Sequence, residues 1–321
     1  MIRVGLECSS SLSQHPTGVQ RYINGVLSGF DRVGNVIPTR LFKSSRWQKR
    51  AYLPQSRIAY RWYSPVLGLV GCPYDVIHCM DPTLPWSFLK SPLIVTVHDT
   101  YLAIHADDIP YRKKKEKLSK LKKACARAAH IVVPTEAIKN ELSDLFGMSF
   151  KITAIPHGIS QDFFRYEENI RPAWLPESPF ILAFAGGKRK NLLRIINAFR
   201  NSILWSDGWC VLVVGQPDEK EKSEIEKIKI SDRCRVVNKI SDSSLIAAYK
   251  NCNGVCYPSL YEGFGFPVLE AMAANVPVVT SNNGATKEIS ADRATLVNPY
   301  EVQDILAGLN KIPGIGKDSL D

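Results

Sequence analysis

The chain lacks the features that mark several common classes of protein. Its eight cysteines form no Cys-x-x-Cys pair and its six histidines show no metal-ligand spacing, so no disulfide framework and no metal site are predicted. No apolar run approaches the roughly 20 residues that span a bilayer. The first apolar stretch is too short for a secretory signal. Together these absences predict a cytoplasmic protein.

Two phosphate-related motifs are missing as well. The sequence has no Gly-x-x-x-x-Gly-Lys-Ser/Thr segment, so a P-loop is not expected. It also has no Asp-x-Asp before a loop, the arrangement that would hold Mg²⁺ or Mn²⁺ on a diphosphate. Any phosphate chemistry is therefore expected to proceed without a metal.

What is present indicates two α/β domains. The chain has 321 residues, of which 45% are hydrophobic, enough for two domains with a core each. Buried strands alternate with helices in both halves, which predicts two Rossmann-like, doubly wound parallel sheets facing a cleft. We expect an N-terminal domain over 1–165, a proline-rich linker over 166–179 and a C-terminal domain over 180–321.

Positive charge is concentrated in one segment. The net charge is +10, which favours anionic partners. Residues 112–127 hold nine basic residues and one acid around a narrow apolar stripe that includes Leu121 and Cys125. This helix is either a solvated helix with one packed face or a contact for an anionic membrane surface. Nucleic acid is not expected, since no aromatic platform or reading helix accompanies the charge.

The most informative stretch lies between Tyr257 and Ala274. A short apolar strand ends at Tyr257, and a glycine-containing loop leads into a helix that begins near Pro267. Gly263 and Gly265 allow close backbone approach at the positive end of that helix, which suits a phosphate. Glu262 and Glu270 would accept hydrogen bonds from hydroxyl groups. The stretch predicts a site for a nucleotide, a sugar or both.

Polar segments follow other predicted strands. The turn after Phe184 contains Gly187, Arg189 and Lys190, which offer backbone donors and two cations to a diphosphate. In the first half, Gly18 closes a polar loop and His98 follows a strand, where doubly wound folds bind ligands. Arg46 to Tyr63 is basic and aromatic; it forms either an acceptor site or a surface helix pair.

Glu262-Gly-Phe-Gly-Phe-Pro-Val-Leu-Glu270 resembles the paired-glutamate signature of retaining glycosyltransferases of family 4, which have the GT-B fold. The similarity continues for some forty residues to Asn298-Pro299, and two shorter segments, around Gly18 and around Lys190, are similar too. By that resemblance His157, where relatives commonly have Asn, is expected to be a turn residue. Relatives usually continue with a helix that crosses back onto the first domain, and we expect this final helix to be missing here.

The resemblance also implies that the N-terminal domain is the acceptor side and the C-terminal domain the nucleotide-sugar donor domain, and it implies roles for the candidate residues. Glu270 would hold the ribose hydroxyls, and Glu262 the donor sugar. Arg189 and Lys190 would stabilise the leaving diphosphate, and His98 would face the sugar. The remaining donor contacts would be made by Gly18, Gly187, Ile240, Gly263, Phe264, Gly265 and Phe266.

The implied activity is retaining, metal-independent transfer of a sugar from a nucleotide-diphosphate sugar, with GDP-mannose favoured. The implied acceptor is a glycan or lipid-diphosphate-linked sugar in polysaccharide or O-antigen assembly, at the inner face of the membrane. Two alternatives remain open: a GT-B-fold epimerase or phosphorylase, and a non-catalytic nucleotide-sugar-binding subunit.

Overall fold

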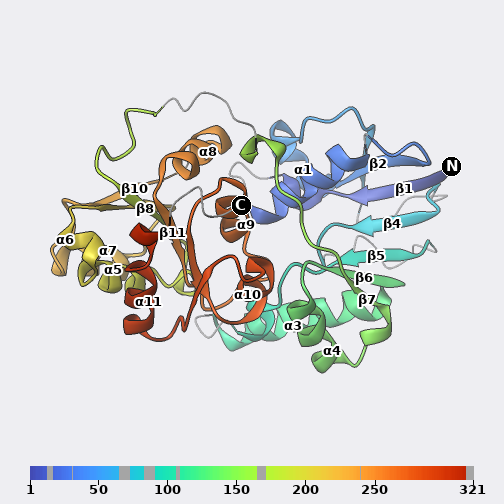
Figure 1. The fold of residues 1–321 in the computed structure, drawn as a ribbon. Helices are drawn as coiled ribbons and strands as arrows, with labels where there is room; N and C mark the ends of the chain where they lie inside the picture. The colour runs from blue at the N-terminus through green and yellow to red at the C-terminus, as the bar shows by residue number, and fades with distance from the viewer. Residues whose placement is uncertain are drawn as a thin grey trace. The chain divides into compact units, whose positions relative to one another are not determined.

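The computed structural model describes residues 1–12, 17–30, 32–64, 73–82, 91–105, 109–164, 171–238 and 240–315. These residues form two compact units, Met1–Gly158 and Ile159–Asp321 (Figure 1). The division falls before the predicted domain end at residue 165, because Phe163 is buried in the second core, where its ring packs 5.7 Å from that of Tyr249. Leu175, inside the predicted linker, is buried in the same core.

The first unit is a seven-stranded parallel sheet in the order β3-β2-β1-β4-β5-β6-β7. Its strands are β1 (Ile2–Glu7), β2 (Val36–Lys43), β3 (Tyr60–Tyr63), β4 (Val76–Cys79), β5 (Leu93–Thr96), β6 (His130–Val133) and β7 (Ile152–Ala154). Its helices are α1 (Gly18–Phe30), α2 (Tyr101–Ile104), α3 (Tyr111–Arg127) and α4 (Glu136–Phe146), with 3-10 helices η1 (Ser9–Ser11), η2 (Ser44–Tyr52) and η3 (Ser149–Lys151).

The second unit is a six-stranded parallel sheet in the order β10-β9-β8-β11-β12-β13. Its strands are β8 (Phe180–Phe184), β9 (Cys210–Val214), β10 (Cys234–Val237), β11 (Gly254–Tyr257), β12 (Val278–Ser281) and β13 (Thr295–Val297). Its helices are α5 (Leu192–Arg200), α6 (Ile203–Ser206), α7 (Glu219–Lys227), α8 (Asp242–Asn251), α9 (Phe266–Ala273), α10 (Gly284–Ser290) and α11 (Val302–Leu309), with 3-10 helices η4 (Gln161–Phe163), η5 (Lys188–Lys190) and η6 (Ile312–Gly314).

Both sheets reverse strand order next to their first strand, as doubly wound folds do. In the second unit the period-2 alternation of β8 explains the packing: Ile181 and Ala183 belong to one buried cluster, Phe180 and Leu182 to the other. The predicted fold class, two parallel-sheet α/β domains, is confirmed.

One expectation fails, in the segment 46–63, for which the sequence left two interpretations open. Residues 46–63, for which a surface helix pair was one interpretation, contain instead the end of the short 3-10 helix η2 and the edge strand β3. Pro54 ends the helical stretch, and Tyr60, Trp62 and Tyr63 have the aromatic character of a strand. The predicted basic helix is confirmed as α3, with Leu121, Ala124 and Cys125 buried.

Within the described ranges, no helix is long and apolar enough to cross a membrane. The same ranges contain no cluster of three or more His, Cys, Asp or Glu side chains that could hold a metal ion.

Candidate active site

The predicted phosphate turn follows β8 at its carboxyl end. Gly186 and Gly187 have φ angles of 138° and 90°, a backbone conformation that only glycine adopts without strain. They lead into η5, whose three residues Lys188, Arg189 and Lys190 are all basic. The turn therefore presents its cations directly past the end of the sheet, where open α/β folds bind ligands.

Asn191 ends η5 and holds this turn in place, a role that was not predicted. Its φ is 63°, which asparagine tolerates better than most residues. Its buried side-chain amide donates to the carbonyl oxygens of Pro258 (2.9 Å) and Pro299 (2.7 Å). One side chain thus joins the loops after β8, β11 and β13. The Arg-Lys-Asn sequence was the available signal, but the two carbonyl partners lie 67 and 108 residues away.

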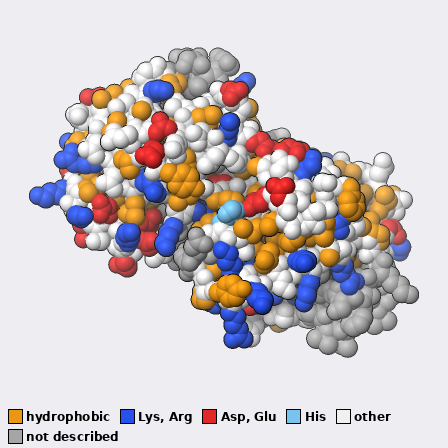
Figure 2. Space-filling view, turned by 90° about the horizontal axis from the view of Figure 1, so that it is seen from below, with side chains coloured by type: hydrophobic (Ala, Val, Ile, Leu, Met, Phe, Trp, Pro, Cys, Tyr) orange, Lys and Arg blue, Asp and Glu red, His pale blue; other side chains and the backbone are white. Residues whose placement is uncertain are grey.

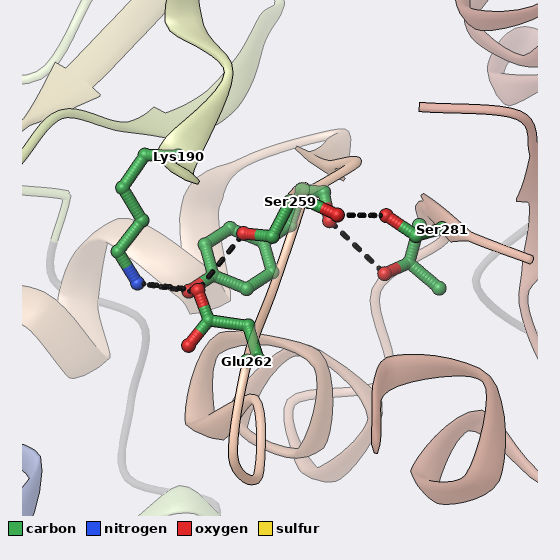
Figure 3. A network of polar contacts seen from close by, with 6 residues as sticks. Lys190, Ser259, Glu262 and Ser281 are labelled. Carbon is green, nitrogen blue, oxygen red and sulfur yellow. Dashed lines mark hydrogen bonds and ion pairs between the residues drawn. The ribbon is translucent and has the colours of Figure 1, made fainter. Parts of the chain in front are cut away.

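Lys190 reaches the glutamate loop that follows β11. Its Nζ lies 2.8 Å from Glu262 Oε1 and also contacts the Tyr257 hydroxyl. Tyr257 and Ser259 donate to the same carboxylate oxygen at 2.7 and 2.9 Å. Figure 3 shows these side chains converging from two loops on one point. Glu262 is thereby held by three donors in a single orientation.

The electrostatics of this network keep Glu262 ionised. Its side chain is only 9% exposed, and burial by itself raises the pKa of a carboxyl group. The positive charges of Lys190 and Arg189 and the hydrogen bonds outweigh that effect, so the pKa of Glu262 is lowered. Burial, followed by the neighbouring Glu262 charge, raises the pKa of Tyr257. Tyr257 therefore stays a neutral hydrogen-bond donor.

The backbone under this network is tied to the next strand. Ser281 of β12 donates to the Ser259 carbonyl oxygen at 2.5 Å, and Thr280 donates to the Tyr257 carbonyl oxygen at 3.0 Å. Both contacts are drawn in Figure 3. The loop that carries Glu262 is thus positioned by the sheet itself, as precise binding geometry requires.

The glycine loop ends at the amino terminus of α9. Gly263, Phe264 and Gly265 are buried, and Gly265 has a φ of 98°. A β-carbon on Gly265 would lie 3.0 Å from Thr286 Cγ2, so both backbone angle and space favour glycine there. Phe266 begins the helix, and its ring packs 5.1 Å from that of Phe264. This amino end offers N–H groups and the positive helix dipole to an anion.

Glu270 lies one turn further along α9 and is 2% exposed. Tyr249 of α8 donates to its Oε2 at 2.8 Å. Ile240 precedes α8, is partly buried and packs against the same core cluster. Two neighbouring helices, α8 and α9, thus set the position of Glu270.

The first unit carries the other two predicted residues. Gly18 begins α1 and is exposed, next to Thr17, whose hydroxyl accepts from the Gln20 amide at 3.2 Å. His98 follows β5. Its Nε2 lies 2.8 Å from the Met80 carbonyl oxygen and its Nδ1 lies 3.2 Å from Nε2 of His157.

His157 is a buried partner of His98, which sequence reasoning missed by treating it as a turn residue. It is 6% exposed, and Tyr22 packs 4.4 Å from its ring. Burial, followed by the His98 charge, lowers the pKa of His157 to about 3. The same causes lower the pKa of His78 to about 4, and burial lowers that of His98. The array is neutral at physiological pH.

Neutrality determines the tautomers in this pair. A carbonyl oxygen can only accept, so the His98 Nε2 carries the proton that is donated to Met80. The His98 Nδ1 must then accept from the His157 Nε2–H. Because both nitrogens of His98 have partners, the ring would have to leave one of them to exchange a proton with a substrate.

The structure therefore brings some of the predicted site residues together. In the second unit Lys190 and Glu262 are in direct contact, Arg189 acts on Glu262 electrostatically, and the Arg189 carbonyl oxygen accepts from the Leu260 amide at 2.8 Å. Glu270 has its own partner, Tyr249. In the first unit His98 pairs with His157. The catalytic and binding roles of these residues remain predictions.

Comparisons with known proteins agree with this geometry. Residues 20–163 match the family model described as "Glycosyltransferase Family 4", and residues 167–313 match "Glycosyl transferases group 1". The chain is 27% identical over 223 residues to the O-antigen chain mannosyltransferase RfbU of Salmonella typhimurium, which covers 68% of this chain and 60% of that protein. It thus spans less than two thirds of that relative's length.

Solved structures share the fold at low sequence identity. Sucrose-phosphate synthase from Thermosynechococcus elongatus superposes with a TM-score of 0.77 at 16% identity, over 98% of this chain and 90% of that one. Anabaena HepE in complex with UDP and glucose gives 0.75 at 14%, over 100% and 92%. With two parallel-sheet units, and family models that match each half in turn, this chain belongs to the group 1 glycosyltransferases of family 4, which have the GT-B fold.

Proposed function

We propose that the protein transfers a hexosyl group, with mannosyl favoured, from a nucleotide-diphosphate sugar to a glycan or lipid-diphosphate-linked acceptor, with retention of anomeric configuration. The mannosyl preference and the role in cell-surface polysaccharide assembly draw on the similarity to the O-antigen mannosyltransferase of Salmonella. The nucleotide-sugar donor is also supported by the similarity to HepE, which was crystallised with UDP and glucose. GDP-mannose is the donor that we propose first.

The observation that carries this proposal is the Lys190–Glu262 contact beside the amino terminus of α9. Breaking a bond to a nucleoside diphosphate builds negative charge on the leaving phosphate, and stabilising that charge is the main catalytic task. Lys190, Arg189 and the helix amides supply positive charge there, while Glu262 offers a carboxylate oxygen to a sugar hydroxyl. Cation and carboxylate side by side suit a sugar attached to a phosphate.

We further propose that the reaction needs no metal, because these cations and amides take the place of Mg²⁺ at the diphosphate. The test is turnover in excess EDTA, compared with turnover in added Mg²⁺ or Mn²⁺. Equal rates are expected. A rate that falls at least tenfold in EDTA and returns with a metal would contradict metal independence.

The donor is tested by calorimetric titration of GDP, UDP, GDP-mannose and UDP-glucose into the wild type and Glu270→Ala. We expect one nucleotide series to bind selectively, and the variant to lose at least tenfold in affinity because the ribose hydroxyls lose their acceptor. Equal affinity of wild type and variant would overturn the assignment of Glu270. Selective binding of UDP would replace GDP-mannose as the donor.

Two other functions are compatible with the same fold. An epimerase or phosphorylase would change the sugar or its phosphate, and a binding subunit would change neither. A nucleotide-release assay separates them: transfer liberates nucleotide only when acceptor is present, apart from slow hydrolysis. Retention is read separately from the anomeric configuration of the product by NMR.

We propose that the protein lies peripherally at the inner face of the membrane, where it would meet a lipid-linked acceptor substrate. The basic side chains of α3 are almost all exposed. Figure 2 shows one face of the molecule, on which Lys and Arg side chains lie among acidic and apolar ones. Each basic residue near an anionic leaflet contributes about 1 kcal/mol. In a co-sedimentation assay with phosphatidylglycerol vesicles, the wild type should be found in the vesicle pellet and the α3 variant K113E/K117E/K120E should not. The matched α7 variant K220E/K222E/K227E should bind like the wild type, and equal loss in both would contradict a specific role of α3.

A further inference from the structure

The first unit contains a long stretch from which acidic residues are absent. Between Asp31 and Asp75 the sequence has no Asp or Glu over 43 residues, although the whole chain averages about one acid per ten residues. The same stretch contains eight basic residues: Arg32, Arg40, Lys43, Arg46, Lys49, Arg50, Arg57 and Arg61. The stretch is therefore positively charged and contains no acid of its own.

Aromatic rings are layered at the centre of this stretch. Phe42 of β2 is fully buried, Trp62 of β3 packs 5.5 Å from it, and Trp47 of η2 packs 4.9 Å from Trp62 at an interplanar angle of 67°. Trp47 forms the outer layer and is 50% exposed. The buried Phe42 and the partly buried Trp62 support the exposed indole from below, so it forms an aromatic platform.

Cations border the exposed indole. The Arg50 guanidinium lies 5.3 Å from the centre of the Trp47 ring, within the range of a cation–π contact. Lys49 and Arg50 are both exposed. Tyr60, also half exposed, adds a second ring on the same strand face as Trp62, and its ring packs 6.3 Å from that of Phe42. One surface thus combines an apolar ring with charge that can bind an anion.

This surface is fastened to the carboxyl edge of the first sheet. The Lys43 amide donates to Ser9 Oγ at 2.9 Å, and Arg46 donates to the Ser9 carbonyl oxygen at 2.8 Å. Ser9 in turn donates to the buried carboxyl of Glu7, which Tyr63 also contacts at 2.9 Å. The platform is therefore continuous with the loop after β1, where doubly wound folds bind ligands.

We propose that η2 and β3 form the binding surface for a sugar that carries a phosphate group, with the sugar ring on Trp47 and the phosphate on Lys49 and Arg50. This inference rests on the proposed glycosyl transfer and makes the acceptor an anionic glycan. The C–H face of a sugar packs on an indole ring as other apolar surfaces do, and the phosphate gains charge-assisted hydrogen bonds. A neutral glycan would gain nothing from the exposed cations Lys49 and Arg50.

A single-stranded nucleic acid is the competing ligand for aromatic and basic groups. Such proteins stack successive bases on several rings along a charged groove. Here the two half-exposed rings, Trp47 and Tyr60, come from separate elements, and each already has an arginine guanidinium over it, so they do not form a row of stacking positions. The geometry favours one sugar with one anionic group.

The test compares the affinities of mannotetraose, phosphorylated mannotetraose and a short oligo-dT for the wild type, Trp47→Ala and K49E/R50E, by calorimetry on the full chain. We expect the phosphorylated sugar to bind at least tenfold more tightly than the neutral one. Trp47→Ala should lose at least tenfold, and K49E/R50E should bring both sugars to equal affinity. The K49E/R50E variant keeps the aromatic layers, so it tests the surface even if Trp47→Ala does not fold. Phe150→Ala, which removes an 85% exposed ring elsewhere in the first unit, is the matched control and should behave like the wild type.

Four outcomes would overturn the inference. They are equal affinity for the two sugars in the wild type, tighter binding of oligo-dT, unchanged binding by both platform variants, and binding of phosphatidylglycerol vesicles that Trp47→Ala abolishes to the same degree as sugar binding. Nucleotide affinity is measured in the same samples. If the nucleotide binds normally and the sugar does not, only the acceptor surface is refuted; if no nucleotide binds, the proposed glycosyl transfer fails first.

Discussion

Lys190 Nζ and Glu262 Oε1 lie 2.8 Å apart although 72 residues of sequence separate them. Both side chains are largely withdrawn from solvent, at 18% and 9% exposed. A pair of this kind costs desolvation free energy, and removing one partner leaves a buried charge alone. We expect the pair to serve donor binding rather than stability. The free energy of unfolding and the affinity for the donor should therefore respond differently when the pair is changed.

Lys190→Met should lower the free energy of unfolding by about 3 kcal/mol, because the buried Glu262 carboxylate loses its cation. The double variant K190M/E262Q should recover much of that loss, yet neither variant should regain affinity for the nucleoside diphosphate. Thermal melting and calorimetry measure the two effects. Lys120→Met, which breaks the exposed Lys120–Glu116 pair, is the control and should melt like the wild type. Donor affinity restored in the double variant would contradict a role of Lys190 at the diphosphate.

Tyr249→Phe should weaken nucleotide binding about tenfold without unfolding the protein. The hydroxyl holds Glu270 Oε2 at 2.8 Å, and a hydrogen bond to a charged group contributes about 1.5 kcal/mol or more in place. Calorimetry with the preferred nucleotide measures the change. Tyr74→Phe, a buried tyrosine of the first unit, should leave affinity unchanged. A Tyr249→Phe affinity equal to that of the wild type would show that Glu270 needs no support from α8.

Asn191→Asp should destabilise the second unit more than Asn191→Ala does. Alanine removes two hydrogen bonds, at a cost of about 2 kcal/mol. Aspartate instead points a negative oxygen at the Pro258 and Pro299 carbonyl oxygens, which adds repulsion in a buried position. Melting temperatures of the two variants give the comparison. Asn201→Asp is the control, since its amide also donates to a carbonyl oxygen but lies at the surface. Equal destabilisation by Asp and Ala at 191 would contradict the donor role.

The stability of the first unit should fall as the pH drops below about 6.5. His157 and His78 have pKa values of about 3 and about 4 in the folded chain, below the usual value near 6.5. The unfolded state therefore binds protons first, and each histidine stabilises the fold fully above pH 6.5 and loses that contribution between 6.5 and its folded pKa. The slope is about 1.4 kcal/mol per pH unit for each.

Amide hydrogen exchange in β5 measures this slope for the first unit alone, through protection factors at pH 7.5, 6.5 and 5.5. His157→Asn should reduce the slope, because one of the three buried neutral imidazoles is removed. A variant that keeps the full wild-type slope would mean that other groups cause the acid sensitivity.

Much of the fold and of the geometry of the candidate site was predictable from sequence, because the signals are local. β8 and β11 end where predicted, at Phe184 and Tyr257, since short buried strands of a parallel sheet are continuous apolar runs. Gly187 and Gly265 were identified as turn and loop glycines, and their positive φ angles show why no other residue suits. The similarity that begins with the paired-glutamate motif extends over some forty residues, from Glu262 to Pro299, so the family was identifiable from the sequence alone.

Contacts between distant segments were decided only by the tertiary structure. Nothing near Lys190 in sequence indicates that its partner is Glu262, or that Asn191 bonds to the carbonyl oxygens of two other loops. His157 looked like a turn residue because its environment is created by His98 and Tyr22, far away along the chain. Edge strand β3 escaped prediction because an edge strand is half solvated and lacks the apolar run of a central one. Strands, turns and short motifs depend on neighbouring residues, so the sequence alone determines them. Burial, pKa values and hydrogen-bond partners depend on which distant segments the parallel sheets bring side by side.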